Sequence, residues 1–186
     1  LIAKDFERAV FLIENQFGDI YEGGDQVKLQ YWLAEIPEAI VFSKPHLCTL
    51  NAWNLFACGQ LDAANQSLEA AENILESSKS LEPNALLVKD EISETNRVKL
   101  LGRVATIRSI LASYSGNIPH IIKYARQALE HLPLQELSWR SIASITIGDA
   151  YTREGEMMLA REARSNALEA SKTSGDAYLI IIVNLT

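Results

Sequence analysis

The 186-residue chain has 24 acidic and 17 basic residues, a net charge of −7, and a hydrophobic content of 48%. This composition is typical of a folded globular chain and excludes a disordered or collagen-like one. The acidic balance argues against direct nucleic-acid contact, which rests on clustered Lys and Arg, and no apolar run approaches the roughly 20 residues needed to cross a bilayer.

Apolar residues recur at intervals of three and four residues along nearly the whole chain, a spacing that predicts an all-α fold. Proline and glycine residues interrupt this pattern and divide it into short segments. We expect about nine helices, over Ala3–Gln16, Asp25–Glu35, Pro45–Ala57, Leu61–Ser77, Glu91–Ser115, Ile118–His131, Leu137–Arg153, Glu156–Thr173 and a last segment that begins near Asp176.

The stretch Ser77–Asn84 is polar and contains Pro83, which gives it the composition of a linker. Its two flanks share one composition and one helical period, so nothing in the sequence marks two independent cores. We therefore predict a long loop within a single domain that covers residues 1–186. The chain starts at Leu1 and stops at Thr186 within an apolar stretch, and we expect it to be a fragment of a larger protein.

Three loops share a pattern in which one helix ends at a glycine and another begins a few residues later. The glycines are Gly59, Gly116 and Gly155. A glycine can adopt the left-handed conformation that caps a helix, and small side chains let two helices approach closely. The pattern predicts a row of antiparallel helical hairpins.

The third unit resembles the tetratricopeptide (TPR) repeat. Ile147-Gly148, Tyr151, Gly155, Ala160 and Ala167 stand at that repeat's spacing. The first unit matches at Ala52, Leu55, Gly59, Ala64, Leu68 and Ala71, and the second at Gly116, Ala128 and Pro133. Arg164 departs from the pattern, because it stands where the repeat has an aromatic residue. The three loop glycines lie 57 and then 39 residues apart, more than the standard period of about 34.

The irregular spacing and several motifs resemble the helical-repeat region of the MalT-like group, the large ATP-dependent LuxR-type transcription regulators. The motifs are Trp32-Leu33-Ala34-Glu35-Ile36-Pro37, Lys44-Pro45-His46-Leu47-Cys48, Asn51-Ala52-Trp53, Gly59–Ala64 and Arg126–Pro133. The resemblance implies a superhelix between a nucleotide-binding module and a helix-turn-helix, which helps to sense an inducer and controls self-association. The chain has no phosphate-binding loop and no evident recognition helix, so neither ATPase nor DNA-binding activity is assigned to it.

If the TPR offsets hold, the first helix of each pair faces a concave groove. The candidate effector- or partner-binding residues are then Trp53, Phe56, Arg103, Thr106, Tyr114, Asp149, Thr152 and Arg153. Aromatic side chains beside Arg, Thr and Asp suit a small polar molecule or a peptide. For Trp53 the alternative is packing within the core, which is the usual role of a large aromatic residue.

No set of residues has the spacing of a catalytic or metal site. His46, His120 and His131 lack partners at metal-ligand spacing, and no serine stands in a Gly-x-Ser-x-Gly motif. Cys48 and Cys58 fall on different faces of one helical pattern, which favours structural thiols in a reducing compartment. We predict a non-enzymatic, cytoplasmic segment with no metal and no cofactor.

Two functions therefore remain open. The first is the sensor and oligomerisation segment of a MalT-like regulator, which binds a small effector, a protein or a second protomer. The second is a TPR-type adaptor that binds a peptide or protein and is unrelated to transcription, since any such scaffold shows the same Gly-Ala periodicity. A third hypothesis, an α-helical enzyme, has much weaker support than these two, because no nucleophile-base or acid-base set is present in the sequence.

Overall fold

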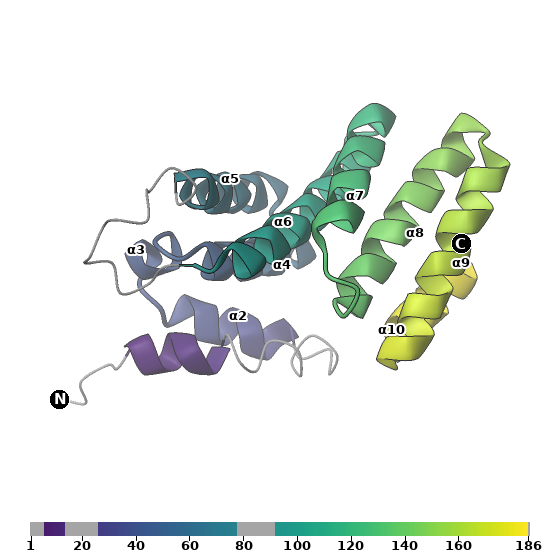
Figure 1. The fold of residues 1–186 in the computed structure, drawn as a ribbon. Helices are drawn as coiled ribbons and strands as arrows, with labels where there is room; N and C mark the ends of the chain where they lie inside the picture. The colour runs from purple at the N-terminus through teal and green to yellow at the C-terminus, as the bar shows by residue number, and fades with distance from the viewer. Residues whose placement is uncertain (1–5, 14–25, 78–91, 186) are drawn as a thin grey trace. The chain divides into compact units, whose positions relative to one another are not determined.

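The computed structural model describes residues 6–13, 26–77 and 92–185, and within them every regular element is a helix and no strand occurs (Figure 1). The all-α prediction is confirmed for this part of the chain. The chain separates into two compact units, Leu1–Glu82 (unit 1) and Pro83–Thr186 (unit 2). The boundary falls in the predicted loop Ser77–Asn84, most of which lies outside the described residues, so the single-domain expectation stays a prediction.

Unit 1 contains a helical stretch at residues 6–13, followed by α2 (Gln26–Ala34), α3 (Glu38–Val41), α4 (Pro45–Ala57) and α5 (Leu61–Ser77). The bounds of α4 and α5 are those predicted from the sequence. The ends of the predicted first helix, Ala3–Gln16, lie outside the described residues. The four-residue α3 was not predicted, because it is about one turn long and shows no periodicity of its own.

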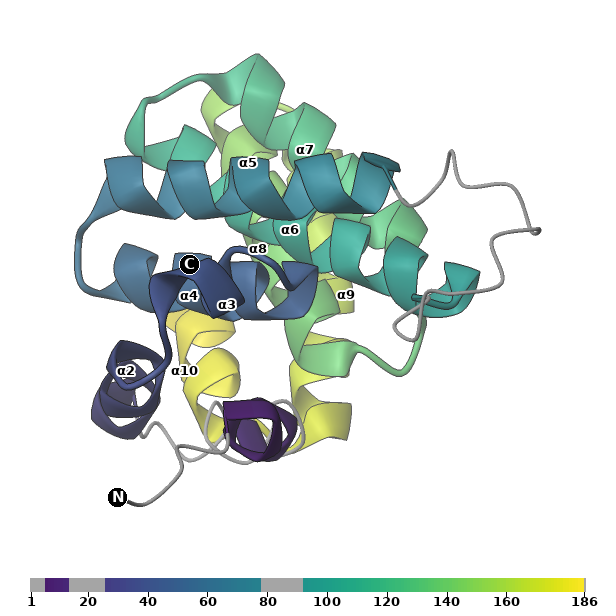
Figure 2. The same cartoon turned by 90° about the vertical axis from the view of Figure 1, so that its left-hand side faces the viewer.

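The α4–α5 pair forms a hairpin whose two helices lie side by side (Figure 2). Pro45 occupies the first turn of α4, where its missing N–H leaves no hydrogen bond unmade. The two helices bury a row of alanines and leucines between them: Leu47, Leu50, Ala52, Ala64, Leu68, Ala71 and Leu75. The buried Ser67 hydroxyl donates a hydrogen bond of 2.9 Å from α5 to the Cys48 carbonyl of α4, a bond that requires the helices to pack closely.

Unit 2 contains α6 (Glu94–Tyr114), α7 (Ile118–His131), α8 (Leu137–Glu154), α9 (Met157–Ser174) and α10 (Ala177–Leu185). These bounds agree with the predicted helices to within three residues. Side-chain caps explain where α6 and α7 begin. The Ser93 hydroxyl accepts a hydrogen bond from the Asn96 N–H, and the side-chain Oδ1 of Asn117 accepts one from the His120 N–H. Successive helices run antiparallel, so the turns after α6 and α8 lie at the same end of unit 2 (Figure 1).

The three loop glycines all stand at hairpin bends, as predicted. Gly59, Gly116 and Gly155 have φ values of +75°, +68° and +82°. After each glycine, the next residue donates its N–H to the carbonyl five residues earlier: Gln60 to Leu55, Asn117 to Ala112 and Glu156 to Tyr151. This is the Schellman arrangement, which satisfies carbonyls at a helix end and requires a left-handed residue. The three hairpins therefore turn by the same local mechanism.

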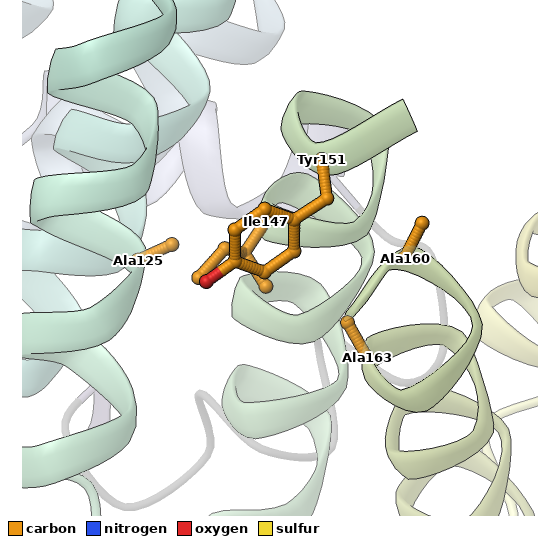
Figure 3. Packing of buried hydrophobic residues seen from close by; sticks show 5 residues of the cluster. All are labelled: Ala125, Ile147, Tyr151, Ala160 and Ala163. Carbon is orange, nitrogen blue, oxygen red and sulfur yellow. The ribbon is translucent and has the colours of Figure 1, made fainter. Parts of the chain in front are cut away.

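Small residues bring α7, α8 and α9 together around one buried cluster. Ala125 of α7, Ile147 and Tyr151 of α8, and Ala160 and Ala163 of α9 form it (Figure 3). The Tyr151 ring extends from α8 toward α7, and the two alanines of α9 let that helix approach from the other side. Elsewhere between α8 and α9, the Ser141 hydroxyl donates to the Ala167 carbonyl at 3.0 Å.

Two arginines link α7 to α8. Arg140 of α8 donates from Nη1 to the carbonyl oxygens of Leu129 and Leu132, at 2.9 and 2.7 Å. These carbonyls stand at the C-terminal end of α7, where no intrahelical donor remains. Arg126 of α7 donates from Nε and Nη2 to the Tyr151 hydroxyl, at 3.1 and 2.8 Å. Successive hairpins in unit 2 are thus joined by hydrogen bonds as well as by apolar packing.

Within the described ranges, no helix combines the length and the apolar character needed to cross a bilayer.

Candidate functional site

The eight candidate groove residues fall in two groups, one in each unit. Trp53 and Phe56 belong to α4 of unit 1, and their rings lie 5.7 Å apart between centroids with a tilt of 52°. Both side chains are half-buried, so the choice between a binding role and a packing role for Trp53 stays a prediction. The other six candidates belong to α6 and α8 of unit 2.

Arg103 of α6 is held against the start of α8. Its Nη2 lies 2.7 Å and its Nε 2.8 Å from Oε2 of Glu136, and its guanidinium carbon lies 5.7 Å from the centroid of the Trp139 ring. The Arg103 side chain is only 13% exposed. Its charge is therefore neutralised within the protein, and a ligand would have to compete with Glu136 for it.

Thr106 and Tyr114 have opposite environments on the same helix. Thr106 is fully buried, and its hydroxyl donates to the Gly102 carbonyl at 2.9 Å, so it offers no surface to a ligand in this structure. Tyr114, the last residue of α6, is 66% exposed beside the Gly116 bend. Helical offsets placed both residues on one face, but the offsets carry no information about how close the neighbouring helices approach.

Asp149, Thr152 and Arg153 occupy the C-terminal half of α8. Asp149 and Arg153 are one turn apart and share a face; the first is half-buried and the second exposed. The Thr152 hydroxyl donates to the Gly148 carbonyl at 2.9 Å, and Asp149 accepts a single bond of 3.3 Å from Nη2 of Arg164 on α9. Of the groove candidates in unit 2, Tyr114 and Arg153 are exposed, and Asp149 and Thr152 are partly accessible.

Several residues with polar contacts were not selected as candidates from the sequence. Glu136 neutralises Arg103 from 33 positions away, and Arg126 binds Tyr151 from 25 positions away. No local pattern indicates such pairs, because only the packing of the helices brings them together. Arg164 did leave a sequence signal, its departure from the aromatic of the TPR pattern, and the structure places it against Asp149.

The two cysteines differ in exposure. Cys48 is buried and Cys58 exposed, and neither forms a disulfide. The Cys48 Sγ donates to the Val41 carbonyl at 3.2 Å, and burial raises the pKa of this thiol to about 11. A thiol that stays protonated at neutral pH is a poor nucleophile and a poor metal ligand. Among the residues that the structure describes, no three His, Cys, Asp or Glu side chains gather as metal ligands would.

One comparison with known proteins finds a match, and it covers the C-terminal part of the chain. Residues 102–186 match the model of a family described as the MalT-like TPR region. No curated protein and no solved structure matches the chain significantly. The match covers most of α6 and all of α7–α10, so this stretch is a MalT-like TPR helical region, as the resemblance implied. It includes the Arg126–Pro133 motif, whereas the motifs from Trp32 to Ala64 lie outside it.

Proposed function

We propose that this MalT-like TPR region is the sensor and oligomerisation segment of a cytoplasmic LuxR-type regulator. In this role it binds a small effector, a protein or a second protomer on the first helices of its hairpins, and it carries no metal, cofactor or catalytic site of its own. Repeats of this type typically serve as non-catalytic interaction modules. The observation that carries the proposal is the family match over residues 102–186.

The accessible candidates support a binding surface of mixed character. Tyr114 supplies an exposed aromatic ring, Asp149 a carboxylate and Arg153 a cation. Such a surface suits a ligand that has both apolar and hydrogen-bonding groups. Because each hairpin contacts mainly its neighbours, a ligand that bridges two of them changes the rotation between them, and such rotations add along a stack of repeats.

Calorimetric titration of the 186-residue chain tests this function. Oligosaccharides and other small polar metabolites form one panel of probes, and sedimentation velocity with and without each probe reports self-association. We expect one probe class to bind and to change the sedimentation coefficient. Replacing Tyr114 or Arg153 with Ala should weaken this binding, whereas Lys172→Ala, an exposed change on α9, should leave it unaltered. A surrounding reading frame that lacks both a phosphate loop and a helix-turn-helix contradicts the regulator assignment.

A second candidate function is a peptide- or protein-binding adaptor that is unrelated to transcription. Met157 and Met158, at the first turn of α9, are 61% and 79% exposed. Flexible, exposed methionines are common on surfaces that bind varied protein partners. The same titrations separate the two functions, because an adaptor should bind extended peptides and ignore small metabolites.

A further inference from the structure

Arg164 occupies an unusual position for a cation. It lies in the middle of α9, where the TPR pattern has an aromatic residue, and its side chain crosses α8 at Gly148. A Cβ atom added to Gly148 would lie 3.3 Å from Cγ of Arg164, closer than side chains normally pack. Because Gly148 has no side chain, the Arg164 side chain can pass over α8 at this position and reach Asp149.

The guanidinium group of Arg164 makes little use of its hydrogen-bonding capacity in this position. Its contact with a carboxylate is a hydrogen bond of 3.3 Å from Nη2 to Oδ1 of Asp149, longer than the usual length for a charge-assisted hydrogen bond. Its Nε is shut off from solvent and has no hydrogen-bond acceptor in the structure. A buried donor without an acceptor destabilises the fold.

The Arg164–Asp149 pair is nevertheless accessible from solvent. The Arg164 side chain is 27% exposed and the Asp149 side chain 40% exposed. Exposed Arg153 lies one turn beyond Asp149 on α8. An anion that approaches this side of the hairpin therefore meets more positive than negative charge from Arg164, Arg153 and Asp149.

We propose that Arg164 binds an oxyanion, a carboxylate or phosphate group of the effector, and that Asp149 holds the arginine in place until the oxyanion binds. This inference rests on the proposed ligand-binding function and names the chemistry of the ligand. Guanidinium binds two oxygens side by side through Nε and one Nη, a geometry that lysine cannot reproduce. Asp149 contacts only Nη2, so an external oxyanion can supply the acceptor that Nε lacks.

The exchange of partners has a mechanical consequence. Nε becomes accessible only if the guanidinium turns outward, and the stem of Arg164 then leaves its place over Gly148. The packing between α8 and α9 depends on that stem, since Gly148 also lies near Ala160 and Ala163 of α9. Binding of the anion is thereby coupled to the geometry of the hairpin.

Titration of the full 186-residue chain with inorganic phosphate and with acetate, at constant ionic strength, tests the proposal. The measured signal is the arginine Nε–H resonance of Arg164, assigned by its loss in Arg164→Lys. We expect a saturable shift with at least one of the two anions. Asp149→Asn removes the internal competitor and should tighten binding by roughly two- to fivefold, the range expected for loss of a partly exposed ion pair.

The control is the Nε–H resonance of Arg161, on the same helix and exposed. Equal shifts at Arg161 and Arg164, or no tightening in Asp149→Asn, would mean that the anion acts only by general screening and would overturn the proposal. Response to phosphate alone indicates a phosphorylated effector, and response to acetate alone a carboxylate; either supports it.

The outcome separates this inference from the proposed function. A silent Arg164 in a chain that still binds an effector rejects only the role of Arg164. A responsive Arg164 in a chain that binds no effector and does not self-associate rejects the sensor function instead.

Discussion

Two glycines in unit 2, Gly155 and Gly102, are required for different reasons, one conformational and one steric. Gly155 has a positive φ and open space around it, so its requirement is conformational. Gly102 is helical and buried in α6, and a Cβ atom there would lie 2.8 Å from Cγ and 3.0 Å from the backbone nitrogen of Leu132. Its requirement is steric, because it lets the end of α7 contact α6.

Adding a methyl group to a packed core usually costs about 1–3 kcal/mol, and the gain in helix propensity from Gly to Ala offsets about 1 kcal/mol of that cost. Gly102→Ala should therefore lower the free energy of unfolding by up to about 2 kcal/mol. Urea denaturation measures the change. In a Leu132→Ala background the atoms nearest to the new methyl are gone, so the loss caused by Gly102→Ala should be smaller there. An equal loss in both backgrounds would show that Leu132 is not the obstacle.

Cys48 should make stability depend on alkaline pH. Burial raises the pKa of its thiol from 9.0 to about 11, so between these values the folded chain retains a proton that the unfolded chain has released. Stability should be unaffected by this group below pH 9 and should fall as the pH rises from 9 toward 11. Urea denaturation from pH 8 to 11 tests it. Cys48→Ala should flatten this dependence, and Cys58→Ala, at an exposed thiol, should not.

At the scale of the helices, the contact of Arg140 with the end of α7 is a polar link between two hairpins. We expect Arg140→Met, which keeps much of the side-chain volume, to lower the free energy of unfolding by about 1.5–3 kcal/mol, since hydrogen bonds from a charged donor are lost. Arg161→Met, on an exposed face of α9, is the matched control and should change stability by less than about 0.5 kcal/mol. Similar losses in both variants would contradict this role for Arg140.

The helices themselves could be predicted from the sequence because their ends are set locally. Pro45 begins α4, Asn117 caps α7, and Gly155 ends α8, and each residue acts through its own backbone geometry or through atoms within one turn. The short α3 could not be predicted in this way. It is stabilised by contacts made after the chain has folded, among them the burial of Val41 and its carbonyl bond to Cys48.

The candidate site was less predictable than the helices. TPR offsets suggest the face on which a residue lies, and of the residues chosen in this way Tyr114 and Arg153 are exposed. The offsets do not identify partners, so the pairing of Arg103 with Glu136 and the burial of Thr106 could not be foreseen. Such features depend on helix separation, which a single sequence pattern does not encode.

At the scale of the whole chain, charge is unevenly distributed. Residues 1–82 contain 13 acidic and five basic residues, and residues 83–186 contain 11 acidic and 12 basic residues. Unit 1 therefore has a net charge of −8 and unit 2 a net charge of +1. An excess of one sign destabilises a compact state by self-repulsion, and salt screens that repulsion.

We expect sodium chloride to stabilise unit 1 more than unit 2. The tryptophans report on each unit separately: Trp139→Phe leaves Trp32 and Trp53 in unit 1, and Trp32→Phe with Trp53→Phe leaves Trp139 in unit 2. Urea midpoints from fluorescence at low and moderate salt give the comparison. The same data test the single-domain prediction, because two transitions that coincide at every salt concentration require one cooperative unit. An equal salt response in separate transitions would contradict the charge argument.

The left-handed bends also change how tolerance to mutation should be read from this structure. Gly59, Gly116 and Gly155 are exposed, with no atom close enough to obstruct a larger side chain. From their exposure alone, these three positions would be expected to tolerate almost any substitution. Yet every missense change there introduces a Cβ atom at a torsion angle that L-residues rarely adopt. Drift in these surface loops is therefore limited by chirality rather than by space.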